Sequence, residues 1–522
     1  MAKTFSITTA IDYTNSAPHI GHAYEKVLAD VIARYHRLKG EKVFFLTGVD
    51  QHGQKVQQSA AREGVAPAEF VKGVTAKFVD LWKKLDVRYD EWAETIDERH
   101  TRVVRGMLQR LFDEGQIYKD KQAGFYSVRQ EQFLTDKEKG PDGEFGPEWG
   151  SVEFREEENY YFKLSQHKQW LLDYLKGRAD AVLPDFRQVE LRNAVERLDG
   201  DLCISRPKSR LDWGIELPFD PQFVTYVWFD ALTNYISFAD YDASQSTFTN
   251  QPSTFQERWP ALQVIGKDIL IPAHGIYWLI MLHAIGFSEV EMPQLFVHGF
   301  WNISGAKMSK SEGNVIDPNV LADKYGVDAL RYYLMSNIAT GRDADFLEER
   351  LVTRYNTDLA NSLGNLLNRS LNMAAKYRDG KLFRLVDHGL QPRAEYFVSV
   401  FEPLMNDYDI SATLAVILRL VTEANQFVEQ TAPWKLAKQA EQDALSRVLY
   451  HLAEVLRIIA ILLSPVCPKA AHVIFDQLNW RMELSGKEER FRLNDAKWGG
   501  LPDGHTLGTP VPLFPRIETT SG

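Results

Sequence analysis

The sequence predicts an α/β protein in which a parallel sheet, interrupted by an insertion, is followed by an all-α helical bundle. Three observations support this prediction. Strand and helix patterns alternate along residues 1–116 and again along 223–298, the residues between them are polar and rich in glycine, and long amphipathic helices without strands follow residue 353. A chain of 522 residues is also too long for one core, so several structural units are expected.

The first segment has the order of a βαβ unit. Its expected strands are residues 5–10 and 43–46, and its expected helices are 23–38, 56–62 and 70–85. A strand, a crossover helix and a second strand form a parallel pair. Residues 1–116 are therefore expected to form the first half of a Rossmann-like domain.

The rest of the chain divides by the same patterns. Residues 117–222 lose the alternation and are expected to be a connective insertion. The second half of the sheet is expected in 223–298, with helices at 228–238 and 276–285 and strands at 262–265 and 295–297. Residues 299–352 would join this domain to the bundle, 353–522, whose expected helices are 359–377, 393–407, 410–431 and 444–464. The apolar residues 511–515 are expected to pack back onto the body.

The composition is that of a cytoplasmic protein. Apolar residues make up 44% of the chain and charged residues 25%, and no apolar run is long enough to span a bilayer. The chain enters its first strand without the apolar core of a signal peptide. The net charge of −11 excludes promiscuous binding of nucleic acid, although a local basic face could still bind it. No oligomerisation domain follows the bundle, so a monomer without membrane contacts is expected.

A His-x-Gly-His sequence stands where the first strand gives way to the first helix. His19 and His22 flank Ile20 and Gly21, and helical spacing starts directly after Pro18. The first N–H groups of a helix have no intrahelical partners and the helix dipole adds positive charge, so this turn attracts phosphate. Imidazole N–H groups can stabilise charge on phosphorus, and Gly21 keeps the approach open. Taken alone, the pattern is better explained by two residues that cap a helix.

A lysine-rich segment far along the chain changes that balance. Lys307 and Lys310 belong to the sequence Lys-Met-Ser-Lys-Ser, with Gly305 and Gly313 on either side. Such a segment predicts a loop that can close two ammonium groups over a polyphosphate. By itself it could be a solvated surface loop. Together with the histidine turn it predicts a site for ATP.

These two motifs resemble the HIGH and KMSKS signatures of class I aminoacyl-tRNA synthetases, and the residues around them narrow the resemblance to methionyl-tRNA synthetases. The resemblance runs from about Phe5 to the end of the chain. It includes the segments 17–24, 45–53, 157–162, 226–235, 265–269 and 432–434.

The resemblance implies a methionine–tRNA ligase. Such an enzyme activates L-methionine with ATP to methionyl-adenylate and transfers methionine to the 3′ end of tRNA(Met) for protein synthesis, including initiation. Mg²⁺ is expected with ATP. The residues expected to act in catalysis are His19, His22, Lys307 and Lys310, and the expected ATP-binding set adds Gly21 and Asp268. The histidines would lie at the α-phosphate, the lysines at the polyphosphate and Asp268 at the nucleoside.

The methionine site is expected to combine one carboxylate with an apolar, polarisable wall. Asp50 follows the strand that ends at Gly48, and its carboxylate can bind an ammonium group; a turn-forming aspartate is the alternative. Aromatic edges favour a thioether sulfur. Trp228, Ala231 and Tyr235 have the i, i+3, i+7 spacing of one helix face, which is more often plain core. The resemblance favours a pocket, and it adds the residues Ile11, Tyr13, Arg206 and His274.

His274 departs from the family pattern by one residue. It follows Ile269 of the Gly-Lys-Asp-Ile segment by five positions, where the family has four. Either a bulge absorbs the extra residue or His274 is displaced.

The cysteines predict the zinc-free branch of the family. Only Cys203 and Cys467 are present, without a CxxC pair, and the segment 118–164 within the insertion has no cysteine. No structural metal is therefore expected. The insertion also has only about a hundred residues, which is too small for the editing domain of the isoleucine, leucine and valine enzymes.

In the bundle the resemblance implies that Asn365, Arg369 and Trp434 read the anticodon. Amide, guanidinium and indole groups can bond to and stack on unpaired bases. Asn365 could instead cap or bridge helices, and Trp434 could be core.

Three other functions remain as alternatives. Another class I synthetase would share both motifs. A nucleotidyltransferase would not need a helical domain of some 170 residues after the lysine segment. A catalytically silent tRNA-binding relative would have no use for both phosphate-binding motifs.

Overall fold

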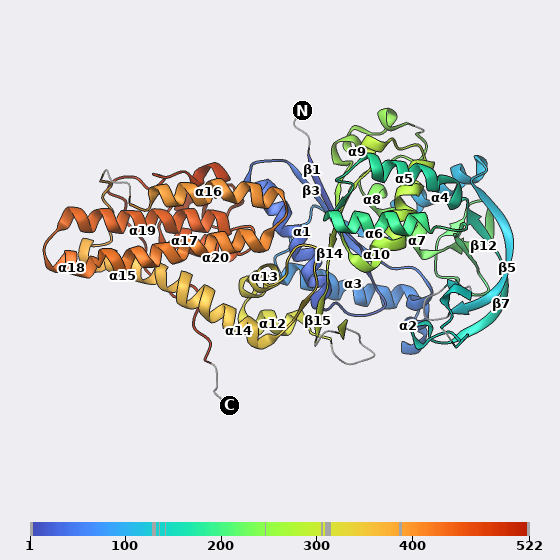
Figure 1. Ribbon diagram of the computed structural model, residues 1–522, viewed down its shortest axis with the longest axis horizontal. Helices are drawn as coiled ribbons and strands as arrows, with labels where there is room; N and C mark the ends of the chain where they lie inside the picture. The colour runs from blue at the N-terminus through green and yellow to red at the C-terminus, as the bar shows by residue number, and fades with distance from the viewer. Residues whose placement is uncertain are drawn as a thin grey trace.

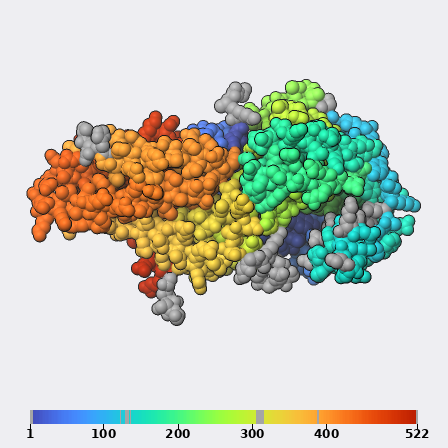
Figure 2. Space-filling model, in the orientation of Figure 1, coloured from blue at the N-terminus to red at the C-terminus, as the bar shows by residue number. Residues whose placement is uncertain are grey.

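The computed structural model describes residues 4–127, 132–134, 136–140, 142–245, 247–303, 306–307, 315–385 and 389–518. The molecule is elongated, with an α/β part at one end and a helical bundle at the other (Figure 1). In the space-filling view, the yellow segment around α12–α14 fills the space between these two parts (Figure 2). No helix within the described ranges is both long and apolar enough to cross a membrane.

A seven-stranded sheet forms the centre of the α/β part. Its strands are β1 (Phe5–Thr9), β2 (Asp12–Tyr13), β3 (Val43–Asp50), β4 (Glu91–Glu94), β8 (Val182–Leu183), β13 (Leu262–Gly266) and β14 (Gln294–His298). Their order is β2-β3-β1-β13-β14-β8, β4 also pairs with β3, and every pairing is parallel. The chain leaves β1 first toward β3 and later returns on the other side as β13. The carboxyl ends of β1 and β13 therefore form a topological switch point, where such sheets bind ligands.

Helices cover both faces of this sheet. The first face carries α1 (Ile20–Leu38), α2 (Gln54–Glu63) and α3 (Pro67–Lys84). The second carries α4 (Glu98–Asp113), α5 (Lys168–Gly177), α6 (Asp185–Glu196), α7 (Val227–Leu232), α8 (Asn234–Ser237), the π-helical stretch η5 (Leu270–Trp278) and α11 (Leu279–Ala284). Successive residues of β3 serve the two faces, since Phe45 packs into the first core and Leu46 into the second.

The insertion is built on a long antiparallel hairpin. β5 (Ile117–Ser127) pairs with β7 (Val152–Phe162), and β6 (Gln132–Leu134) and β9 (Leu202–Cys203) extend the sheet. A second small sheet contains β10 (Ser205–Pro207), β11 (Glu216–Leu217) and β12 (Asp220–Thr225). Between β7 and β9 the chain returns to the main sheet, because β8 pairs with β14. The expected insertion, 117–222, thus does not lie wholly outside the main sheet.

Short elements join the sheet to the bundle. β15 (Trp301–Ile303) pairs with β16 (Ala306–Lys307) and β17 (Ala344–Asp345), and α12 (Pro318–Tyr325), α13 (Val327–Ser336) and α14 (Glu348–Arg354) follow or flank them. The bundle contains η8 (Tyr355–Gly364), α15 (Asn365–Arg378), α16 (Gln391–Asn406), α17 (Ile410–Thr431), α18 (Pro433–Lys438), α19 (Gln442–Leu463) and α20 (Pro468–Gln477). Short helical segments elsewhere are α9 (Ser253–Arg258) and α10 (Lys267–Ile269).

The C-terminal segment returns to the bundle, as the apolar residues predict. The Tyr355 hydroxyl donates to Pro515 O at 2.8 Å, and the ring of Phe514 lies edge-on to that of Tyr355. The α/β parallel sheet and the trailing bundle confirm the predicted fold class.

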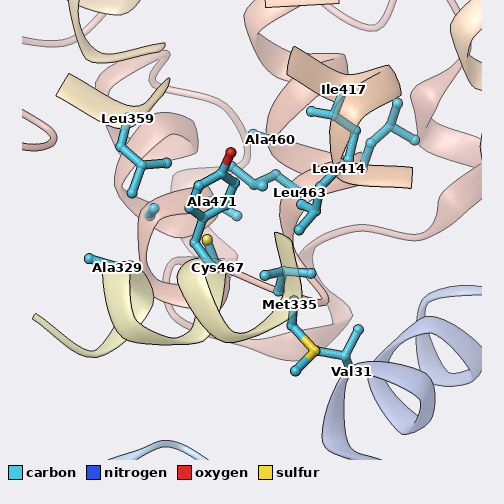
Figure 3. Packing of buried hydrophobic residues seen from close by; sticks show 14 of the residues in the cluster. Val31, Ala329, Met335, Leu359, Leu414, Ile417, Ala460, Leu463, Cys467 and Ala471 are labelled. Carbon is cyan, nitrogen blue, oxygen red and sulfur yellow. The ribbon is translucent and has the colours of Figure 1, made fainter. Parts of the chain in front are cut away.

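The core of the bundle continues into the first face of the sheet. Figure 3 shows Val31 of α1 beside Met335 of α13, with Cys467, Leu463 and Leu414 of the bundle close to them. A buried ion pair crosses the same junction. The Arg331 guanidinium donates to Asp30 of α1 at 2.7 Å. The first helix is therefore packed directly against the bundle.

Two expected helices differ from the structure. The helix expected at 228–238 is divided at Thr233 into α7 and α8, because the Asn234 side chain donates back to Ala231 O at 2.6 Å. The helix expected at 276–285 is preceded by further helical residues of η5, which is kinked at Ile271.

Candidate active site

A cavity opens at the switch point of the sheet. Its volume is about 370 Å³. Its lining residues come from the ends of β1, β2 and β3, from α7 and α8, and from η5, and include Ala10, Ile11, Tyr13, Asp50, Lys55, Tyr226, Trp228, Ala231, Asn234, Tyr235, Ile269, His274 and Tyr277. Seven of the eight residues expected at a methionine site therefore meet in one cavity.

Asp50 supplies the acidic group of this cavity. It is the last residue of β3, which runs four residues beyond the strand expected at 43–46, and it is 6% exposed. Its backbone carbonyl accepts from the N–H and the hydroxyl of Thr14, both at 2.9 Å. The N–H of His52 approaches Asp50 Oδ1 at 3.4 Å. A carboxylate held at this edge can bind a ligand ammonium group.

The backbone turn after Asp50 requires glycine. Gly53 has a φ of 106°, and a Cβ on it would lie 2.6 Å from the hydroxyl oxygen of Tyr13. Tyr13 lines the cavity, so the close contact between Gly53 and Tyr13 lies directly behind the cavity wall.

The opposite wall is aromatic. Trp228 and Ala231 line the cavity from α7 and Tyr235 lines it from α8, so all three lie on the same side despite the division at Thr233. Tyr235 is 1% exposed and packs at 5.7 Å against Trp278. An apolar wall with aromatic edges suits a thioether or another polarisable side chain.

His274 lines the cavity from η5. This stretch is kinked at Ile271, which departs from helical angles with φ −118° and ψ 122°. The Tyr235 hydroxyl lies 2.7 Å from His274 Nε2, and His274 Nδ1 lies 3.0 Å from Ile269 O. The Nδ1–H therefore donates to the carbonyl, and Nε2 accepts from Tyr235. Burial lowers the pKa of His274 to about 4, so the ring is neutral near pH 7.

Arg206 is placed behind the cavity and does not line it. Its guanidinium stacks on the ring of Tyr226 at 4.3 Å and donates to Ser205 O at 2.7 Å. Tyr226 lines the cavity and precedes the first residue of α7. Arg206 thus supports a lining residue.

The His19–His22 turn begins α1. The Gly21 N–H donates to His19 Nδ1 at 3.0 Å, and the His19 N–H donates to His22 Nδ1 at 3.1 Å. Both rings accept at Nδ1, so each neutral ring carries its proton on Nε2. A Cβ on Gly21 would lie 2.8 Å from the His19 ring, so glycine leaves room for that ring. The turn presents two imidazole donors at the positive end of a helix.

The other expected ATP-binding residues follow β13 and β14. Asp268 lies on α10, directly after β13, and is exposed. The backbone of Lys307 lies in β16, opposite Asn302, while Lys310 lies outside the described residues. The Ile20 N–H donates to Ile316 O at 3.1 Å. This bond joins the histidine turn to the chain that follows the lysine segment.

A buried charged network, which the sequence did not indicate, joins α1 to the cavity edge. The Lys26 ammonium donates to Ala10 O at 2.8 Å and to the carboxylates of Asp12 and Glu25 at 2.7 and 2.8 Å. Glu25 also lies 3.0 Å from the ring of His298, at the end of β14. Burial raises the pKa of Asp12 to about 7, against the pull of Lys26. The network links α1 to the edge of the cavity.

Lys55 is a second residue that the sequence did not indicate. It lines the cavity from the first turn of α2 and is the one cationic residue among the lining residues. The only hint in the sequence is its position five residues after Asp50, and this spacing does not distinguish it from other surface lysines.

In the bundle, two of the three expected anticodon residues are in contact. The Arg369 guanidinium lies 5.9 Å from the ring of Trp434, which is 37% exposed, and Arg369 donates to Glu429 at 2.7 Å. Asn365 is exposed one turn before Arg369 on α15. An exposed indole beside a guanidinium offers a stacking surface for an unpaired base.

The described residues contain no cluster of three or more His, Cys, Asp or Glu side chains arranged to hold a metal ion. Cys467 is buried and Cys203 is partly buried, and neither forms a disulfide.

The arrangement as a whole can position two ligands side by side. The cavity accepts a small molecule with an ammonium group and an apolar side chain, and the adjoining helix turn accepts phosphate. This geometry suits the attack of a carboxylate on a phosphorus atom, which depends on position and on positive charge.

Two family models and several relatives match this chain over most of its length. The family "tRNA synthetases class I (M)" matches residues 5–143 and 149–371, and "Anticodon binding domain of methionyl tRNA ligase" matches residues 386–521. The methionine–tRNA ligase of Thermosynechococcus vestitus is 39% identical over 528 residues, covering 99% of this chain and 98% of the relative. That of Bacillus subtilis is 40% identical over 536 residues, covering 99% and 78%.

Solved structures agree in fold over the whole chain. Mycobacterium tuberculosis methionyl-tRNA synthetase in complex with methionyl-adenylate has a TM-score of 0.90 and 37% identity, with 98% of this chain and 100% of that chain covered. The free-state form of the same enzyme has a TM-score of 0.84 and 34% identity, with 99% of each chain covered. The chain belongs to the methionine–tRNA ligase family of class I aminoacyl-tRNA synthetases.

Proposed function

We propose that this protein activates L-methionine with ATP, releasing pyrophosphate, and then transfers the methionyl group from the adenylate to the terminal ribose of tRNA(Met). The observation that carries the proposal is the cavity at the switch point. It combines one carboxylate, Asp50, with a wall that includes Trp228 and Tyr235, and it adjoins the turn of His19 and His22.

Each group has a proposed role. Asp50 binds the ammonium group of methionine, and the thioether lies among the side chains of Ile11, Tyr13, Trp228, Ala231, Tyr235 and His274. His274 is neutral and donates its Nδ1 proton to Ile269 O, so it adds no charge beside the sulfur. Arg206 acts through Tyr226.

In the activation step the methionine carboxylate attacks the α-phosphorus in line. His19 and His22 donate from Nε2 to the α-phosphate region, with Gly21 leaving room for the ring of His19. Lys307 and Lys310 bind the polyphosphate, and Asp268 binds the nucleoside. Mg²⁺ enters with ATP and neutralises charge on its phosphates.

The tRNA-binding part of the proposal concerns the bundle. Asn365, Arg369 and Trp434 are proposed to read the anticodon, and their support is the contact between the guanidinium and the exposed indole. The proposed units are 1–116 and 223–298 for the sheet, 117–222 for the insertion, 299–352 for the junction and 353–522 for the bundle, with β8 returning to the sheet. The protein is proposed to act in the cytoplasm as a monomer.

Exchange of label between ATP and pyrophosphate, measured with each amino acid in turn, tests the first step. Methionine should support exchange and the other amino acids should not. Charging of tRNA(Met) but not of other tRNAs tests the second step. Exchange that depends on another amino acid, or no exchange at all, would refute the proposal.

A further inference from the structure

A chain of hydrogen bonds centred on Asp230 lies behind the cavity. Each carboxylate oxygen of Asp230 is 2.7 Å from a ring nitrogen, one from His52 Nδ1 and the other from His100 Nε2. The second ring nitrogen of His100 lies 2.8 Å from Ser237 Oγ. Asp230 and His100 are 0% exposed and His52 is 7% exposed, so water cannot replace these bonds. The sequence suggested no role for any of these four residues.

Asp230 lies where it controls the orientation of α7. It follows Trp228 by two residues and directly precedes Ala231, and both of these line the cavity. The helix has only six residues, so one side chain held at two oxygens fixes its rotation about its axis. A rotation would move the indole of Trp228 relative to the bound side chain.

The partners of Asp230 belong to the other walls. His52 lies two residues after Asp50, and its own N–H approaches Asp50 Oδ1 at 3.4 Å. Ser237 lies two residues after Tyr235 on α8. One carboxylate therefore connects the group that faces the ligand ammonium with the groups that face its side chain.

The chemistry of Asp230 suits a fixed hub. Burial alone would raise the pKa of its carboxyl, but the charges and hydrogen bonds of His52 and His100 outweigh burial and lower it to about 2. The carboxylate is ionised near pH 7 and can only accept. Both histidines must therefore donate to it, so the ring orientations are determined.

The loop of His52 is also held from its other side. The ring of His52 lies edge-on to Trp213 at 5.6 Å, and the Trp213 indole N–H donates to Gln51 O at 2.5 Å. Because the loop is fixed at both ends, a change at Asp230 should shift the position of Asp50 more than that of other residues in the sheet.

We propose that Asp230 is a positioning residue for the amino-acid substrate, which aligns Asp50 with the aromatic wall of α7 through His52 and His100. This inference rests on the proposed function, because it assigns the cavity to methionine. Asp230 does not line the cavity, and its carboxylate bonds to His52 and His100 rather than to the histidine turn proposed to bind ATP phosphate. Its loss should therefore weaken methionine binding selectively.

The test compares Asp230→Asn with the unmodified protein in ATP–pyrophosphate exchange. The two side chains have nearly the same size, but the amide offers an N–H where one histidine requires an acceptor. The KM for methionine should rise at least tenfold, while the KM for ATP should stay within about twofold. A purely structural role would lower the active fraction, and hence kcat, without changing the KM for methionine.

Variants of His52 provide a second measurement that does not depend on the folding of Asp230→Asn. His52→Leu should raise the KM for methionine, and His52→Gln, which retains an N–H donor, should restore part of the loss. The double variant Asp230→Asn with His52→Leu should be no worse than the more affected single variant, because both remove the same link.

Glu454→Gln is the matched control. Glu454 is also 0% exposed and pairs with Arg457 at 2.6 Å, but it lies in the bundle. This variant should change stability without changing the KM for methionine. An unchanged KM for methionine in Asp230→Asn and His52→Leu, or equal increases for methionine and ATP, would overturn the inference. If the unmodified protein shows no methionine-dependent exchange, the proposed function fails instead.

Discussion

The hydrogen bond between Tyr235 and His274 allows a quantitative test of the cavity proposed to bind methionine. The Tyr235 hydroxyl donates to His274 Nε2 at 2.7 Å, while His274 Nδ1 is occupied by Ile269 O. Tyr235→Phe removes the donor and keeps the ring. The Nε2 lone pair of a histidine that is 3% exposed then has no partner from the protein.

The cost of this change should appear in binding more than in folding. A buried acceptor left without a donor costs about 1–3 kcal/mol. In the free protein, the cavity of about 370 Å³ has room for a water molecule that can donate to His274. Bound methionine displaces that water with a thioether, which has no donor. The Kd of methionine should therefore rise about 5- to 150-fold, whereas the Tm should change little.

Calorimetric titration with methionine in the absence of ATP measures this effect directly. Tyr174→Phe is a suitable control, because Tyr174 is 1% exposed and its hydroxyl accepts from Arg178 at 3.1 Å, outside the cavity. The control should bind methionine normally. The reasoning would be refuted if Tyr235→Phe lowered the Tm by several degrees and left the Kd of methionine unchanged.

Three further outcomes are expected. Trp434→Ala should abolish charging of tRNA(Met) while pyrophosphate exchange survives, because the indole lies in the bundle; equal loss of both activities would contradict the anticodon role. Lys310→Ala should slow pyrophosphate exchange severely and hardly weaken methionine binding, and unaltered exchange would contradict its place at the polyphosphate. Burial lowers the pKa of His274 from 6.5 to about 4, so protonation favours the unfolded chain. Its contribution to the free energy of unfolding is complete above pH 6.5 and falls by up to about 1.4 kcal/mol per pH unit toward pH 4. Chemical denaturation at several pH values should therefore show a steeper dependence of this free energy on pH for the unmodified protein than for His274→Gln.

The elements with strong periodicity could be predicted from the sequence. The helix Ile410–Thr431 has the bounds that its apolar spacing predicts, and β1 and β13 are within one residue of expectation. The short strand β8 could not be predicted, since its two residues have no period and its partner, β14, lies more than a hundred residues later. Its pairing is decided by tertiary packing, which local patterns do not contain.

The candidate site likewise contains residues that could be predicted from the sequence and residues that could not. Asp50 and Trp228 could be proposed because each belongs to a motif, and the cavity contains both. The place of His274 depended on the path of the chain through the kink at Ile271, which spacing alone could not decide. The links of Asp230 to His52 and His100 span 178 and 130 residues of sequence. Ordinary aspartate and histidine residues at such separations carry no local signal.

The first helix connects the chemistry to the tRNA-binding part of the protein. Its first turn carries His19 and His22, and in its middle Asp30 accepts from Arg331, which also donates to Pro465 O at 3.0 Å and Val466 O at 2.8 Å, just before α20. Both side chains of this pair are 0% exposed, and breaking a buried ion pair by removing one partner costs about 3–5 kcal/mol. The histidine turn and the bundle are thus attached to one helix. A shift of the bundle on binding an anticodon would have to move this helix or break the pair, and the size of that cost favours movement of the helix.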